Sequence, residues 1–364
     1  MTRFIPEYVE SVVREIKLMS ASSEEKLCVH TVYIGGGTPS LMEPSHIENI
    51  LNVIRQEFNL INEAEVSMEA NPGTVSRDKL LAFRKSGINR ISYGVQSFQP
   101  DDLKLLGRIH TTEEVKTAVL LAREVGFDNL NLDLIYGLPE QKIEMWKDTL
   151  QQALALQPEH ISLYSLTLEA GTWMNHQVQS GKIPAPDDDL AADMYALAES
   201  FLSKEFRHYE ISNWAAERNG KSLECRHNLQ YWLNEPYFGF GAGAHGCIAG
   251  FRFANIADIQ KYIIRIKRAE NMQFPFSPAN DSRIENDVTA EMNETMMLGL
   301  RLTEEGVSRQ RFRDRFGKEM EVIYKESIEK LISQGLIYWD DEKTRLRLTD
   351  RGRLLGNRVF MEFV

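Results

Sequence analysis

The chain has 364 residues, of which 43% are hydrophobic and 26% charged, and its formal net charge is −11. This length and composition suffice for one large core and a smaller one, and the negative charge argues against a broad electrostatic grip on nucleic acid or anionic lipid. Three widely spaced cysteines suit a reducing compartment and no apolar run reaches the length of a membrane span, so we expect a cytoplasmic protein without stable membrane insertion.

The first half of the chain is predicted to be an α/β domain. An amphipathic helix begins near Ile5, and from residue 31 to about 168 short apolar runs alternate with helical periods, the pattern of parallel strands joined by crossover helices. The predicted strands are 32–34, 65–69, 90–95, 129–135 and 160–166, and the predicted helices are 46–58, 76–85, 112–125 and 144–156. Consecutive right-handed units of this kind curl into a full or partial TIM-like barrel.

The second half is predicted to contain two further segments. The stretch 171–255 is rich in Trp, Asn, Tyr and Gly, which indicates loops over one end of the barrel. After about residue 280 the pattern indicates a winged-helix-like α+β unit, with helices at 289–300, 308–316 and 318–334 and hairpin strands at 336–339 and 345–349. We therefore expect a truncated barrel at 1–170, a capping segment at 171–280 and a C-terminal winged-helix-like domain at 281–364.

Winged-helix units often bind DNA, and the alternating arginines in one predicted helix invite that interpretation. These arginines are Arg309, Arg311, Arg313 and Arg315. Acidic residues follow them closely, at Glu319, Glu321, Glu326 and Glu329. Alternating signs are typical of a solvated face, so we expect no nucleic-acid partner.

In a parallel barrel the functional residues collect at the C-terminal ends of the strands. A glycine loop at 35–37 follows the first predicted strand, and Glu69, Gln96, Arg108 and Asp133 follow later ones. Taken singly, Asp133 is ordinarily a turn-capping carboxylate and Arg108 a surface ion pair. Together they present carboxylates, an amide and a guanidinium to one rim, a set that suits a zwitterionic ligand with a diol, such as S-adenosylmethionine (SAM).

Eight motifs occur in order along most of the chain. They are YIGGGTPS at 33–40, EANP at 69–72, GVQSF at 94–98, GRIHT at 107–111, NLDLIYGLP at 131–139, YEISNWA at 209–215, CRHNLQYW at 225–232 and GFGAGAHG at 239–246. In these motifs the chain resembles the radical SAM proteins related to oxygen-independent coproporphyrinogen III oxidase, and among them the HemW heme chaperones. The resemblance implies SAM contacts at Gly36, Gly37, Thr38, Glu69, Gln96, Arg108 and Asp133.

The segment from His227 to Trp232 resembles the HNxxYW motif that is associated with heme binding in HemW proteins. The resemblance implies heme contacts at His227, Asn228, Tyr231 and Trp232, with His227 as the candidate iron ligand, since imidazole binds heme iron and aromatic rings pack on porphyrins. An isolated histidine is more commonly a buried residue held by hydrogen bonds. Cys225, His245 and Cys247 are secondary candidates for an axial ligand.

The chain departs from the family at its iron–sulfur motif. The family holds a [4Fe–4S] cluster with CxxxCxxC, and Cys28, Cys225 and Cys247 do not have this spacing. As written, the chain is expected to bind no cluster and to cleave no SAM. We expect an N-terminally shortened sequence, which also lacks the first barrel strand and leaves the strand at 32–34 with an open edge; a cluster-free variant is the alternative.

Three functions follow from these patterns. The first is a HemW-like chaperone that binds heme near His227 and passes it to an acceptor protein, with the barrel as a regulatory SAM site. The second is the anaerobic oxidative decarboxylation of coproporphyrinogen III, which requires the cluster segment. The third is an unrelated barrel that binds another nucleotide.

Overall fold

The computed structural model describes residues 4–364, which form two compact units. The first unit comprises the chain up to Tyr33, Met42–Val66 and Arg226–Val364, and the second comprises Ile34–Leu41 and Ser67–Cys225. Within residues 4–364, no helix combines the length and the apolar character that crossing a membrane requires.

The main sheet is open and mixed. Its strand order is β1-β2-β3-β4-β5-β7-β6, with β8 paired to β7. Strands β2 to β5 are parallel, whereas β7 is antiparallel to both β5 and β6. The strands are β1 (Cys28–Ile34), β2 (Asn59–Ala70), β3 (Arg90–Gln96), β4 (Leu130–Tyr136), β5 (His160–Ser165), β6 (Phe206–Glu210), β7 (Asn213–Arg218) and β8 (Lys221–Ser222). β1 and β6 end the strand order, so the sheet is a partial barrel, as predicted.

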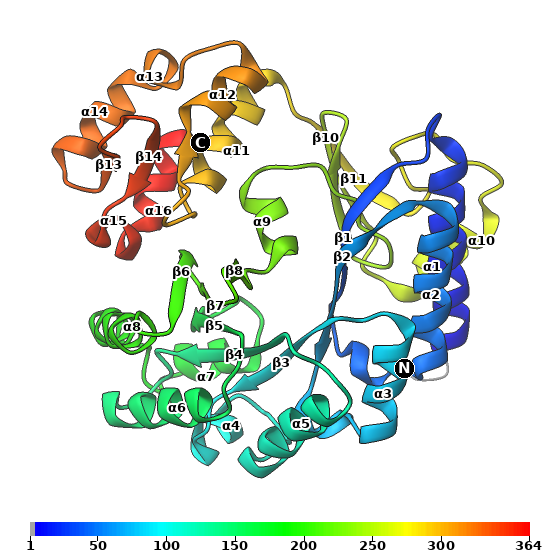
Figure 1. Cartoon of the computed structure of the whole chain (residues 1–364), viewed down its shortest axis with the longest axis horizontal. Coiled ribbons are helices and arrows are strands. Elements are labelled where there is room, and N and C mark those ends of the chain that lie inside the picture. The colour runs from blue at the N-terminus through cyan, green and yellow to red at the C-terminus, as the bar shows by residue number, and fades with distance from the viewer. Residues whose placement is uncertain (1–3) are drawn as a thin grey trace. The chain divides into compact units, whose positions relative to one another are not determined.

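Crossover helices bury the apolar strands of the second unit. β3, which lies between β2 and β4, is buried at nearly every position, including the polar residues Arg90, Ser92 and Gln96. The helices are α3 (Arg77–Ser86), α4 (Pro100–Leu105), α5 (Thr112–Glu124), α6 (Ile143–Ala155), α7 (Trp173–Gln179) and α8 (Asp188–Leu202), with 3-10 turns at Pro39–Leu41 and Pro72–Thr74. α4, α5 and α6 lie along one side of β3 and β4 (Figure 1). Thr111 and Glu114 form a capping box that fixes the start of α5.

The first unit contains two small antiparallel sheets besides its share of the main sheet. Their strand orders are β11-β10-β9 and β12-β14-β13, and the second packs with helices as a winged-helix-like unit near the C-terminus (Figure 1). The strands are β9 (His245–Ile248), β10 (Phe251–Asn255), β11 (Asn280–Glu285), β12 (Val307–Ser308), β13 (Ile337–Trp339) and β14 (Arg345–Leu348). The helices are α1 (Ile5–Ser22), α2 (Pro44–Glu57), α9 (Arg226–Trp232), α10 (Ile259–Arg268), α11 (Val288–Gly299), α12 (Arg309–Phe316), α13 (Met320–Ile323), α14 (Lys325–Ser333), α15 (Asp350–Leu354) and α16 (Gly356–Phe360), followed by a 3-10 turn at Met361–Phe363.

The five predicted strands and the helices between them are confirmed, but two other predictions are wrong. The stretch 171–255 is not mainly loops, because it contains the 15-residue helix α8 and the strands β6 and β7 of the main sheet. The predicted helix 318–334 is broken at Tyr324, whose hydroxyl donates to Asn293 Oδ1 (2.6 Å) and whose ring packs against Phe363. This tertiary packing outweighs the local helical preference. The three-segment division stays a prediction, and residues 1–3 of its first segment lie outside the described residues.

A buried carboxylate ties α1 to the loop of the GFGAGAHG motif. Glu15 is fully buried and accepts hydrogen bonds from Gly241 N (2.9 Å), Asn255 Nδ2 (2.9 Å) and Tyr262 Oη (2.7 Å), as well as from the Ser277 hydroxyl. Burial raises the pKa of Glu15, whereas these four donors act in the opposite direction. The carboxylate therefore joins segments that are more than 200 residues apart.

We expect Glu15→Gln to lower the free energy of unfolding by about 1–3 kcal/mol, because the new amide NH2 would face a buried donor and leave it unsatisfied. Urea denaturation of both proteins measures the change. Glu10→Gln is the matched control, since Glu10 is exposed on the same helix. Equal unfolding free energies for Glu15→Gln and the control would contradict the structural role of this carboxylate.

Candidate functional site

The glycine loop after β1 is held to the end of β2. Gly36 and Gly37 have φ of +86° and +63°, a conformation that favours glycine, and both are exposed. The Gly36 N–H donates to Glu69 Oε2 (2.9 Å). The next residue, Thr38, is half-buried, and its carbonyl accepts from Leu41 N (3.0 Å). The loop thus presents its exposed backbone beside the carboxylate of Glu69.

Asp133 lies on β4, opposite Gly94 of β3. Its two carboxylate oxygens accept hydrogen bonds from Asn131 Nδ2 (2.8 Å) and Ser92 Oγ (2.8 Å). Burial raises the pKa of Asp133, the hydroxyl and amide donors oppose this shift, and the nearby charge of Glu69 adds to it. Glu69 and Asp133 are therefore close enough for their charges to interact. Gly36 lies at the same place, because its backbone N–H donates to Glu69.

The other two residues of the predicted SAM set, Gln96 and Arg108, lie in different environments. Gln96 ends β3, is buried, and has φ of +69°, a strained conformation for a residue other than glycine. The register between β3 and β4 shifts between Gly94 and Gln96, which marks a bulge at this strand end. Arg108 lies in the exposed loop after α4, where its backbone N–H donates to Leu103 O (2.8 Å). Strained strand ends of this kind are typical of functional sites.

His227, on α9, is held from four directions. Its Nδ1 is 2.8 Å from Thr31 Oγ1 and its Nε2 is 2.9 Å from Tyr231 Oη. Its ring stacks on Tyr33, with centroids 5.0 Å apart and an interplanar angle of 12°. Its backbone N–H donates to Glu65 Oε1 (3.1 Å). The imidazole is therefore half-buried and hydrogen-bonded at both nitrogens.

The motif residues do not all meet on one surface of α9. His227 and Tyr231 are four residues apart and contact each other. Asn228 is half-buried on the same helix. Trp232 instead packs against Arg301, whose guanidinium carbon lies 4.4 Å from the centroid of the Trp232 ring. With Phe312 and Val307, Trp232 also lines a cavity of about 530 Å³. The structure thus brings His227 and Tyr231 together and places Trp232 in a different environment.

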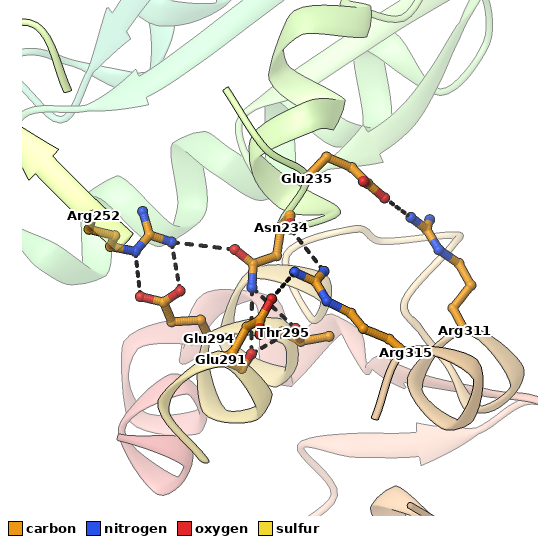
Figure 2. Close-up of polar contacts among 8 residues, drawn as sticks. All are labelled: Asn234, Glu235, Arg252, Glu291, Glu294, Thr295, Arg311 and Arg315. Atoms are coloured by element: carbon orange, nitrogen blue, oxygen red, sulfur yellow. Dashed lines mark hydrogen bonds and ion pairs between the residues drawn. The ribbon is translucent and has the colours of Figure 1, made fainter. Parts of the chain in front are cut away.

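The chain after α9 is fixed to α11 and α12 by the polar cluster shown in Figure 2. Asn234 Nδ2 donates to Thr295 Oγ1 (3.2 Å), and Arg315 donates to the Asn234 carbonyl (2.8 Å) and pairs with Glu291. Arg252 makes a two-pronged ion pair with Glu294 (2.5 and 2.8 Å). We call these residues the Asn234 cluster. This cluster holds the C-terminal end of α9 in place within the first unit.

The arginines of α12 are each paired with a carboxylate. Arg309 pairs with Glu321, Arg311 with Glu235, Arg313 with Glu319 and Arg315 with Glu291. Ion pairing neutralises much of the positive field that a nucleic-acid phosphate would meet.

The secondary axial candidates lie in three environments. Cys225 is buried just before α9, and His245 is exposed on β9. Cys247, also on β9, is half-buried, and burial raises the pKa of its thiol. A raised pKa disfavours the thiolate that binds metals.

The residues of this chain do not fit a [4Fe–4S] cluster. The sequence has only the cysteines Cys28, Cys225 and Cys247, all present as free thiols, and contains no CxxxCxxC. Among residues 4–364, no group of three or more His, Cys, Asp or Glu side chains is arranged to hold a metal ion. No radical step is therefore assigned to residues of this chain.

The comparisons with known proteins agree with the fold. The Radical SAM superfamily matches residues 2–153, and the HemN C-terminal domain matches residues 287–355. The coproporphyrinogen III oxidase HemN of Escherichia coli has a similar structure, with a TM-score of 0.81 and 21% identity over 99% of this chain and 83% of that one. The chain is thus a radical SAM protein by fold.

Two relatives place it within that class. A protein named heme chaperone HemW from Bacillus subtilis (strain 168) is 36% identical over 99% of this chain and 92% of the relative. A second protein of that name, from Lactococcus lactis subsp. lactis (strain IL1403), is 37% identical over 99% of this chain and 90% of the relative. The chain belongs to the HemW family.

Several residues around these sites were not identified from the sequence. Thr31, Tyr33 and Glu65 hold His227, and Ser92 and Asn131 hold Asp133. Asn131 and Asp133 share a strand face at an i,i+2 spacing, a signal that could have linked them. Thr31 and His227 are 196 residues apart, and no sequence pattern indicates that contact.

We expect Arg252→Met to lower the free energy of unfolding by about 1–3 kcal/mol, because Glu294 keeps its charge and loses its two-pronged partner. Glu294→Gln in the Arg252→Met background should restore part of that loss. A double-mutant cycle on thermal unfolding measures the coupling, and a coupling energy near zero would show that this pair does not stabilise the cluster.

Proposed function

We propose that this protein is a heme chaperone, which binds heme at His227 and passes it to an acceptor protein. Two relatives that cover nearly the whole chain bear the name heme chaperone. The observation that carries the proposal is the setting of His227, whose Nδ1 contacts Thr31 while its Nε2 contacts the hydroxyl of Tyr231.

This setting suits a histidine that binds iron reversibly. In one tautomer Nδ1–H donates to Thr31 Oγ1, and the Nε2 lone pair accepts from the Tyr231 hydroxyl. Metal-ligating histidines usually donate their second N–H to an oxygen that orients the ring, which is the part Thr31 would take. Iron binding at Nε2 then requires that Tyr231 withdraw its hydroxyl. The nearby rings of Tyr33 and Tyr231 offer apolar surface for a porphyrin.

We also propose that Gly36, Gly37, Thr38, Glu69, Gln96, Arg108 and Asp133 hold SAM. Glu69 and Asp133 have the acceptor oxygens that an ammonium group and ribose hydroxyls need, and the backbone of Gly36 and Gly37 is exposed beside them. The guanidinium of Arg108 suits the carboxylate of the methionine moiety. Bound SAM would supply a sulfonium nucleoside whose occupancy regulates the chaperone.

A heme titration followed at the Soret band tests the chaperone proposal. We expect saturable binding near one heme per chain, which His227→Ala weakens by about tenfold or more because the iron loses its nitrogen ligand. Tyr231→Phe should bind heme with equal or about fivefold higher affinity, since the Tyr231 hydroxyl then no longer competes for Nε2.

His176→Ala is the matched control, because His176 is an exposed histidine outside the motif. The variants Cys225→Ala, His245→Ala and Cys247→Ala test the secondary ligands in the same assay. Binding that is indifferent to His227→Ala but lost in one of these three variants would move the ligand to that residue. No saturable binding by the parent protein would contradict the chaperone proposal.

We expect Asp133→Asn to weaken SAM binding by about tenfold or more, because an amide NH2 replaces one of the acceptors offered to the ribose. Equilibrium dialysis with radiolabelled SAM measures the affinity. Asp128→Asn is the control, as Asp128 precedes β4 and lies outside the proposed set. Unchanged SAM affinity in Asp133→Asn would remove Asp133 from the site.

A further inference from the structure

A chain of buried hydrogen bonds runs through the second unit and ends on Asp133. Tyr209 Oη is 2.9 Å from His160 Nε2, and His160 Nδ1 is 2.6 Å from Asn131 Oδ1. Asn131 Nδ2 in turn donates to Asp133 Oδ1 (2.8 Å) and to Ser92 Oγ (2.7 Å). Tyr209, His160 and Asn131 are buried, and none of them belongs to the proposed SAM contacts.

The direction of every bond in this chain follows from the carboxylate at its end. Asp133 only accepts when ionised, so Asn131 must turn its NH2 toward Asp133 and its carbonyl oxygen toward His160. A carbonyl oxygen also only accepts, so His160 must carry its proton on Nδ1. His160 Nε2 then has a lone pair, and Tyr209 must be the donor.

The electrostatic surroundings keep both ring groups in the states that this direction needs. Burial, followed by the charge of Arg90, lowers the pKa of His160 well below its usual value, so the imidazole is neutral. Burial raises the pKa of Tyr209 well above its usual value, so the phenol keeps its proton. The backbone N–H of Cys225 donates to the Tyr209 oxygen, which anchors the far end of the chain.

We propose that His160, locked as the neutral Nδ1–H tautomer, is a positioning residue that fixes Asn131 and through it the carboxylate of Asp133 for a ribose diol. Asn131 donates to one Asp133 oxygen and Ser92 to the other, and Ser162 also hydrogen-bonds the carboxylate, so the remaining lone pairs have fixed directions. A ligand with two adjacent hydroxyls then meets a preoriented carboxylate. The proposal rests on the assignment of Asp133 to the SAM site.

Nitrogen-15 NMR of histidine-labelled protein tests the tautomer without any ligand. We expect the His160 ring to show a protonated Nδ1 and an unprotonated Nε2, with no change between pH 8 and pH 6. An Nε2–H tautomer, or an imidazolium within that range, would overturn the proposal. The tautomer of His160 can be measured whether or not the protein binds SAM. This test therefore separates the chain of hydrogen bonds from the proposed function.

Nucleoside binding tests the positioning role. Adenosine carries the diol and 2′,3′-dideoxyadenosine lacks it, so the ratio of their affinities measures the interaction with Asp133. We expect His160→Leu to lower the affinity for adenosine by about fivefold and to leave the dideoxy analogue unchanged, because only the diol contacts are misaligned. His160→Asn should stay within about twofold of the parent protein, since its side-chain NH2 can replace the Nδ1–H donor.

The exposed His176 supplies the control His176→Asn, which should not change either affinity. Equal loss of both nucleosides in His160→Leu would assign His160 a structural role and overturn the positioning role. Tyr209→Phe keeps the aromatic ring and removes only the hydroxyl that donates to His160, so it is the second variant to use if His160→Leu does not fold. It should lower the affinity for adenosine and leave that for the dideoxy analogue unchanged. The parent protein could show the expected tautomer and yet bind both nucleosides equally. That outcome would contradict the assignment of Asp133 to the SAM site, and the chain of hydrogen bonds would stand.

Discussion

The position of α9, the helix that carries His227, depends on one buried carboxylate, that of Glu65. This residue lies on β2, where its two oxygens accept the backbone N–H groups of Arg226 (3.0 Å) and His227 (3.1 Å) at the start of α9. A carboxylate at a helix N-terminus satisfies donors that have no partner within the helix and interacts favourably with the helix dipole. The same contact brings the imidazole of His227 to Thr31 and Tyr33 on β1. Without this cap a seven-residue helix has little intrinsic stability.

The sequence could predict those parts of the fold whose signal is local. The alternation of short strand-like segments with crossover helices predicted β3 at 90–95, against an observed Arg90–Gln96, because that alternation is visible in the local sequence. α8 was missed although its Asp187 cap and its apolar spacing are local, since the surrounding Trp, Asn and Gly residues suggested loops. β6 and β7 were missed because antiparallel pairing with β5 is a tertiary choice.

The site shows the same division between local and distant information. Motifs identified the residues that are proposed to contact a ligand, such as Asp133 and His227. The residues that orient them come from other strands or from distant segments, as with Ser92, 41 residues before Asp133, and Thr31, 196 residues before His227. Residue type alone does not reveal such partners, because serine and threonine occur on most surfaces for unrelated reasons.

The two proposed sites differ in how firmly their key side chain is held. Asp133 ends a buried chain in which every bond has one direction, so its carboxylate is preorganised and the binding of a nucleoside loses little free energy in ordering it. His227 is half-buried, and its Nε2 is engaged by a tyrosine hydroxyl that heme iron must displace. That bond stabilises the heme-free state, and at about 1 kcal/mol it would weaken heme binding by roughly fivefold. A chaperone must release its cargo to an acceptor, so a ligand that has an internal partner to return to suits transfer better than one left exposed.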